Sequence, residues 1–121
     1  APSQWIYIRS FPVGLGEADS TPVGEFVVRT DSKLINPVWR NPRTGEYFAA
    51  DNPDNPIGER WVGIEGVGLY ANLDGYGIHG TIDPGSIGSD ASMGCVRMQD
   101  DDVEIVYESL VEQVSQVIIR P

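Results

Sequence analysis

Hydrophobic and polar residues alternate with a period of two in several short segments of this chain, a pattern typical of half-buried β-strands. In the segment QWIYIRSF at 4–11, aromatic residues at 5 and 7 alternate with isoleucines at 6 and 8. Further short segments are rich in β-branched and aromatic residues, and turn residues separate them. They are EFVVRT at 25–30, RWVGIEG at 60–66, GYGIHGT at 75–81 and QVIIRP at 116–121. The sequence therefore predicts a mainly β protein.

One segment has the 3.6-residue period of an amphipathic helix instead. Its apolar positions are Val103, Val106, Tyr107, Leu110 and Val114. Three aspartates at 100–102 precede them and are expected to cap the helix, with Asp101 and Glu104 at capping-box spacing. A single helix is therefore expected in the C-terminal half of the chain.

The intervening segments carry turn residues rather than a regular period. Residues 12–24 read as a turn-rich connection, and residues 35–59 are rich in proline, asparagine, aspartate and glycine. We expect the second segment to be a long irregular excursion, of the kind that often forms lids or binding loops. No internal repeat or interdomain linker interrupts the pattern, so residues 1–121 are predicted to form one domain.

Composition narrows the class of function. The chain has 121 residues, a formal net charge of −10 and 40% hydrophobic residues. That charge disfavours nucleic acid as a partner, because phosphates would be repelled. No apolar run approaches the roughly 20 residues of a membrane span. A single cysteine cannot form an intramolecular disulfide.

The only histidine and the only cysteine, His79 and Cys95, lie in one glycine- and serine-rich stretch at 75–98. They fit a thiol nucleophile and its general base, although a lone cysteine is often a small buried hydrophobe and a lone histidine a hydrogen-bonded surface residue. Arg97 and the start of the helix favour a thiolate. Gly94 leaves room for a substrate carbonyl, and the N–H groups of Gly94 and Cys95 could form an oxyanion hole.

Several motifs in the same order resemble the catalytic domain of L,D-transpeptidases, the YkuD family of bacterial cell-wall enzymes. The central ones are HGT at 79–81 and SMGCVRM at 92–98; the supporting ones are FPVGLG at 11–16, TPVGEF at 21–26, INPVW at 35–39 and NPIGERWVGI at 55–64. The resemblance implies a β-sandwich of mixed sheets with one helix, and an active cysteine and histidine at the mouth of a cleft.

The resemblance also implies a reaction. Cys95 would attack the bond between the diamino acid and D-Ala of a peptidoglycan stem peptide, and a second stem's amine would resolve the thioester into a 3→3 cross-link. No cofactor and no metal are implied. Carbapenems are expected to acylate the cysteine, and the location is expected to be extracytoplasmic, in the bacterial cell envelope. Hydrolysis of the same acyl-enzyme, as in an L,D-carboxypeptidase, and a non-catalytic wall-binding module are the alternatives.

Residue roles follow from the resemblance. The Gly80 carbonyl is the candidate orienter of the His79 ring, and Ser92 could hydrogen-bond within the nucleophile loop. Arg97 either holds that loop or meets a stem-peptide carboxylate. Tyr76 and Trp61 could line the cleft, although core packing suits Trp61 better.

Two departures from the family pattern stand out. Met93 occupies a position where many members have a second histidine. A strand that usually precedes the segment at 4–16 is missing, so residues 4–10 could present an unprotected edge.

Overall fold

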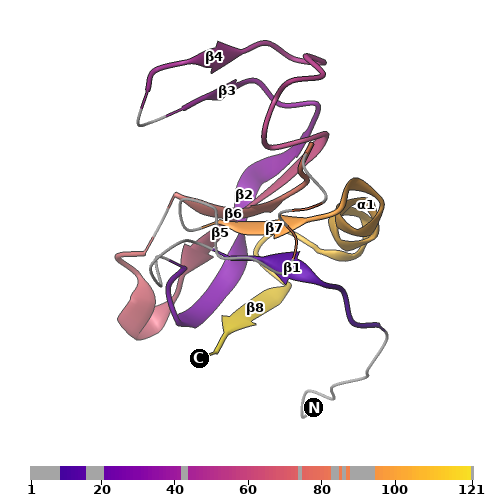
Figure 1. Ribbon diagram of the computed structural model, residues 1–121. Helices are drawn as coiled ribbons and strands as arrows, with labels where there is room; N and C mark the ends of the chain where they lie inside the picture. The colour runs from indigo at the N-terminus through magenta and orange to yellow at the C-terminus, as the bar shows by residue number, and fades with distance from the viewer. Residues whose placement is uncertain are drawn as a thin grey trace.

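Six strands form one mixed sheet, and two more form a separate ribbon, in the computed structural model of this chain (Figure 1). The structure describes residues 9–15, 21–41, 44–73, 75–82, 85, 87 and 95–120. In spatial order the sheet contains β1 (Val13–Gly14), β7 (Val96–Met98), β6 (Tyr76–His79), β5 (Arg60–Gly66), β2 (Gly24–Ile35) and β8 (Gln116–Ile119). Strands β6 and β7 are parallel, and every other neighbouring pair in this sheet is antiparallel.

The expected mainly β fold with one helix in the C-terminal half is confirmed. Strand β5 matches the predicted segment at 60–66, and β6 and β8 lie within their predicted segments. Strand β2 extends well beyond the predicted residues 25–30. Residues 4–8 of the first predicted strand lie outside the described residues, and residues 9–11 are not in a strand.

Strand β1 lies in a segment that we expected to be only a turn-rich connection, which was wrong for these two residues. Val13 pairs with Met98 and Gly14 with Arg97, both on β7. A strand of two residues has no period to detect in the sequence. Pairing with a distant part of the chain creates it.

An irregularity divides strand β2 and curls the sheet. The register with β5 shifts between Val28 and Lys33, and Asp31 adopts a positive φ of 56°. The single hydroxyl proton of Ser32 is shared between the carbonyls of Arg29, at 2.6 Å, and Gly63, at 3.1 Å. The buried Ser32 therefore holds the bulge closed on itself and against β5.

The hydrophobic core lies between the sheet and helix α1 (Asp100–Ser109). Side chains from four strands and the helix meet in it: Val28, Val62, Ile78, Met98 and Val103. Val28, Val62 and Val103 are fully buried. Because neighbouring residues of a strand point to opposite faces, the opposite face of the sheet carries Trp61 on β5 and His79 on β6, and Cys95 lies directly before β7.

The helix begins differently from the prediction. Its N-cap is Gln99, which makes no capping hydrogen bond through its side chain, and all three aspartates lie inside the first turn. The expected capping box was therefore wrong, although the aspartates still place negative charge at the positive end of the helix dipole. The helix ends at Ser109, so Val114 lies beyond it and is 71% exposed.

The predicted irregular excursion contains a short ribbon, β3 (Trp39–Arg40) paired with β4 (Tyr47–Phe48), which stands away from the main sheet at the top of Figure 1. The rings of Trp39 and Phe48 stack across it. The buried Asn55 joins the returning loop to the base of the ribbon by donating to the Pro37 carbonyl at 2.8 Å. A short 3₁₀ turn, η2 (Gly68–Tyr70), follows β5. Among the described residues, no helix has the length and apolar character needed to cross a membrane.

Candidate active site

The parallel pairing of β6 and β7 brings His79 and Cys95 onto the same face of the sheet. Ile78 pairs with Val96 and His79 with Arg97, so Cys95 stands one position before the described ladder, beside Gly77. Two register positions separate Cys95 from His79, about 6–7 Å along strands that lie about 4.8 Å apart. The topology therefore places these two residues near each other on one face of the sheet, and their roles in catalysis stay a prediction.

The imidazole of His79 is fixed by its neighbour in the chain. Nδ1 lies 2.6 Å from the carbonyl oxygen of Gly80, which can only accept, so Nδ1 carries the proton and donates. The N–H of Gly80 in turn donates to the carbonyl of Arg60 at 3.2 Å. This tautomer leaves Nε2 as the nitrogen that can accept a proton.

Trp61 stacks on His79, with ring centroids 5.7 Å apart and an angle of 13° between the planes. The two residues are register partners on β5 and β6. The indole also covers Gly77, where an added Cβ would lie 2.4 Å from Cζ2 of the ring. Glycine at 77 is therefore required for the indole to lie flat on the strand that carries His79.

Burial keeps the imidazole neutral. His79 is 5% exposed, and desolvation is the main cause that lowers its pKa from 6.5 to about 4. The hydrogen bond to Gly80 acts in the opposite direction, and the charge of Arg97 lowers the pKa further. At neutral pH the ring is therefore uncharged and able to act as a base.

Burial also raises the pKa of the Cys95 thiol above its usual value of 9.0. A hydrogen bond from the Gly77 backbone and the charge of Arg97 both oppose this rise without overcoming it. The expectation that Arg97 and the start of the helix would favour the thiolate was therefore wrong in its net direction. Desolvation of the sulfur outweighs the nearby positive charge, and the helix begins with three aspartates.

The lowered pKa of His79 and the raised pKa of Cys95 determine which chemistry the pair can perform. Both groups are neutral in the resting protein at neutral pH, so the thiol still holds the proton that a nucleophile must lose. A neutral imidazole beside a neutral thiol can remove that proton as the sulfur attacks an electrophile. The arrangement fits general-base catalysis rather than a preformed thiolate–imidazolium pair.

The remaining predicted site residues differ in where they lie relative to His79 and in whether the structure describes them. Arg97 lies beside His79 in the ladder, and its charge acts on both candidate catalytic groups. Tyr76, at the start of β6, alternates onto the face opposite His79, so its role in binding stays a prediction. Ser92, Met93 and Gly94 lie outside the described residues, as does the predicted oxyanion hole that depends on Gly94.

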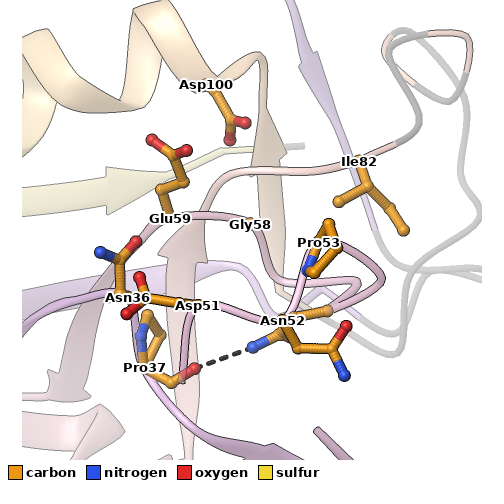
Figure 2. A pocket seen from close by; sticks show the side chains of 10 residues that line it. Asn36, Pro37, Asp51, Asn52, Pro53, Gly58, Glu59, Ile82 and Asp100 are labelled. Atoms are coloured by element: carbon orange, nitrogen blue, oxygen red, sulfur yellow. Dashed lines mark hydrogen bonds between the residues drawn. The ribbon is translucent and has the colours of Figure 1, made fainter. Parts of the chain in front are cut away.

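A pocket of about 280 Å³ lies beside the first residue of helix α1, and neither His79 nor Cys95 lines it (Figure 2). Loop residues at 51–59 and the first residue of α1 line it, and three of the lining residues are acidic: Asp51, Glu59 and Asp100. Figure 2 shows the Asp100 and Glu59 side chains at the same end of this pocket. In the described ranges, no group of three or more His, Cys, Asp or Glu side chains could hold a metal ion.

Trp61 and Asp100 contribute more to this site than the sequence patterns indicated. Trp61 was assigned mainly to the core, and Asp100 was assigned to the helix cap. The signal for Trp61 was the pair of glycines at 63 and 77, which face each other across β5 and β6 and leave space for a large ring. The signal for Asp100 was weaker, because glycines at 58 and 80 lie far from it in the sequence.

Comparison with known proteins gives consistent results. Residues 4–119 match the family model described as "L,D-transpeptidase catalytic domain". A Bacillus subtilis protein named as an L,D-transpeptidase, YqjB, is 37% identical over 101 residues, which is 83% of this chain and 53% of that protein. The chain thus spans about half the length of this curated relative.

Two solved structures share the fold. L,D-transpeptidase 3 from Mycobacterium tuberculosis, in complex with a faropenem-derived adduct, has a TM-score of 0.65 and 20% identity, and the match covers 100% of this chain and 50% of that one. The LD transpeptidase LdtMt1, in complex with imipenem, also has a TM-score of 0.65, with 17% identity and coverage of 93% and 49%. At these identities the likeness is one of fold.

Proposed function

The chain belongs to the L,D-transpeptidase catalytic-domain family, and from that premise we propose that it is a cysteine acyltransferase of peptidoglycan stem peptides. Cys95 is the nucleophile, and His79 is the general base. The reaction cleaves the bond between the diamino acid at position three and D-Ala at position four. It then joins the diamino acid to the side-chain amine of a second stem, which gives a 3→3 cross-link.

The proposed reaction has two halves with a balanced proton inventory. In the first, Nε2 of His79 takes the thiol proton while the sulfur of Cys95 attacks the carbonyl carbon. The tetrahedral intermediate collapses to a thioester, and His79 gives its proton to the departing D-Ala amine. In the second, the acceptor amine attacks the thioester, His79 takes the amine proton, and that proton returns to the sulfur as the peptide bond forms.

One observation carries the assignment of roles: the 2.6 Å contact between Nδ1 of His79 and the Gly80 carbonyl. It supplies the orienting group that a catalytic histidine needs on one nitrogen, while the other nitrogen remains available to a thiol. The pKa of about 4 leaves the ring unprotonated at neutral pH, so Nε2 is free to accept a proton. The raised pKa of Cys95 makes a base necessary.

The comparisons support carbapenems as covalent inhibitors. Two solved proteins of the same fold were studied with faropenem and imipenem, which are β-lactams. We extend this to Cys95, which a carbapenem would acylate at the β-lactam carbonyl. Because the substrate is a cell-wall polymer, the proposed location is extracytoplasmic, in the bacterial cell envelope.

The first test is the intact mass of the protein after incubation with imipenem, with Cys95→Ser as the matched control. The proposal predicts one covalent adduct on the wild type and none on the variant. Since the chain has a single cysteine, the site of a thiol adduct is unambiguous. A folded wild-type protein that forms no adduct would contradict the role of Cys95.

A second test separates transfer from hydrolysis. A synthetic stem tetrapeptide is incubated alone and with an excess of a second stem as acceptor, and the products are identified by mass spectrometry. The proposal predicts a cross-linked dimer and free D-Ala. Tripeptide as the main product in the presence of acceptor would assign the chain to the L,D-carboxypeptidases, and tight binding without turnover would indicate a wall-binding module.

A further inference from the structure

The peptide unit that joins Gly80 to Thr81 connects the candidate base to an acidic side chain. Its carbonyl accepts the proton of His79 Nδ1. Its N–H, which belongs to Thr81, lies near the carboxylate of Asp100 and favours the charged form of that group, lowering its pKa. Because a peptide unit is planar and rigid, a force that fixes its N–H also fixes the direction of its carbonyl.

The space around this peptide unit is shaped for the carboxylate. A Cβ added at Gly80 would lie 2.1 Å from Oδ1 of Asp100, and one added at Gly58 would lie 2.6 Å from the same atom. The Gly58 Cβ would also lie 2.9 Å from both the Gly80 carbonyl carbon and the Thr81 nitrogen. Any side chain at either glycine would push Asp100 away from the peptide unit.

Burial of the Asp100 carboxylate carries a cost in free energy. Its Oδ1 is buried and, among the described residues, completes no hydrogen bond of good geometry, although the N–H groups of Thr81 and Glu59 both favour the charged carboxylate. Burial first, and then the charges of Glu59 and Asp101, raise the pKa of Asp100 in spite of those donors. A carboxylate held at a cost in free energy is typical of a functional position.

We propose that Asp100 is a positioning residue, which holds the Gly80–Thr81 peptide unit and thereby fixes the tautomer and orientation of His79. The inference rests on the proposed function, in which His79 is the base. In serine and cysteine hydrolases, a carboxylate or amide often contacts the histidine directly. Here the carboxylate acts indirectly, because a peptide unit lies between it and the ring.

The test compares Asp100→Ala with Asp100→Asn and with Asp101→Asn. Asparagine keeps an oxygen that can accept the Thr81 N–H, whereas alanine removes it. Asp101 is exposed and lies in the same first turn of α1, so its variant controls for the loss of one negative charge. Melting curves of all three establish that each protein is folded under the assay conditions.

The first readout is the ¹H–¹⁵N spectrum of the imidazole, which a single histidine makes free of overlap. We expect the Nδ1–H tautomer in the wild type, Asp100→Asn and Asp101→Asn, and a mixture of tautomers in Asp100→Ala. The second readout is turnover of a stem tetrapeptide. We expect kcat to fall by about 10- to 100-fold in Asp100→Ala, by analogy with the loss of a hydrogen-bond partner behind a metal-binding histidine.

Asp100→Asn is expected to restore turnover to near the wild-type value, which a purely structural loss in the alanine variant would not explain. A wild-type tautomer and wild-type kcat in folded Asp100→Ala would overturn the inference. The spectrum decides it even if the wild-type protein proves to have no transpeptidase activity. Conversely, an active wild type with an unaffected alanine variant would remove Asp100 from the mechanism and leave the proposed function intact.

Discussion

The indole of Trp61 lies nearly parallel to the imidazole of His79, with 5.7 Å between the ring centroids. This contact excludes water from one face of the histidine, while the Gly80 carbonyl occupies Nδ1. The ring is 5% exposed, and this burial lowers its pKa to about 4 although the hydrogen bond to Gly80 opposes the shift. The neutral state of the ring at neutral pH and its expected sensitivity to acid therefore have the same structural origin.

Acid should destabilise the protein through His79. The pKa is 6.5 in the unfolded chain and about 4 in the folded protein. Between these values the unfolded chain binds a proton that the folded protein does not, so stability is present above pH 6.5 and is lost as the pH falls toward 4. This group should contribute a loss of about 3 kcal/mol over that window.

Urea unfolding of the wild type and of His79→Gln at several pH values measures this loss. The variant controls for carboxylates that titrate in the same range, so only the difference between the two slopes reports His79. Parallel curves would show that the ring titrates normally in the folded protein. The NMR titration of the lone histidine gives the folded pKa independently.

Gly77→Ala should destabilise the protein by displacing Trp61. The new methyl group would lie within 2.4–2.5 Å of two indole carbons, and overpacking of this kind costs about 1–3 kcal/mol. The double variant Gly77→Ala/Trp61→Leu tests the cause, because a smaller side chain at 61 relieves the clash. Additive losses in the double-mutant cycle would show that the two residues do not interact.

Alkylation of Cys95 should be slow at neutral pH. Burial raises the pKa of the thiol, so the rate of reaction with iodoacetamide should rise at a higher pH than for an ordinary cysteine. Arg97→Gln should move this inflection further upward, because the arginine charge favours the thiolate. Arg40→Gln, which removes the same charge from the exposed β3 position, should leave it unchanged. An unshifted inflection in Arg97→Gln would remove Arg97 from the electrostatics of the thiol.

Lys33→Met should loosen the end of helix α1 from the sheet. Nζ of Lys33 donates to the Leu110 carbonyl at 2.8 Å and lies 4.5 Å from the centroid of the Tyr107 ring. Loss of a charged hydrogen bond and a cation–π contact should lower the free energy of unfolding by about 1–2 kcal/mol. Arg29→Met, an exposed cation on the same strand, serves as the control in thermal unfolding. Equal losses of unfolding free energy in both variants would show that the Lys33 contacts to α1 make no specific contribution.

The sequence predicted the elements whose period is local. Strand β5 and the helix have regular patterns of their own, and the glycine-rich setting of His79 and Cys95 marked both residues as a candidate pair. The tautomer of His79 could also be anticipated, because its orienting group is the next carbonyl along the chain.

Contacts between distant segments escaped prediction. Strand β1 forms only by pairing with β7, and the stacking of Trp61 on His79 depends on the register between β5 and β6. The sign of the Cys95 pKa shift was missed for a related reason. The charge of Arg97 is visible in the sequence, whereas the burial that outweighs it emerges only when the sheet is assembled.

The two edge strands of the sheet, β1 paired with β7 and β8 paired with β2, have a consequence for the order in which the molecule folds. Val13 pairs with Met98, and Gly24 pairs with Ile119, so the two edges of the sheet join opposite ends of the chain. Contacts of such long sequence separation require large loops to close before any strand pairing rewards them. The central strands β5 and β6 can pair early as neighbours in the chain. Strand β7 directly follows Cys95 and pairs with β6 through Ile78 and Val96, which are much closer in sequence than the partners of β1 and β8. The candidate nucleophile and base can therefore meet before either edge strand joins the sheet.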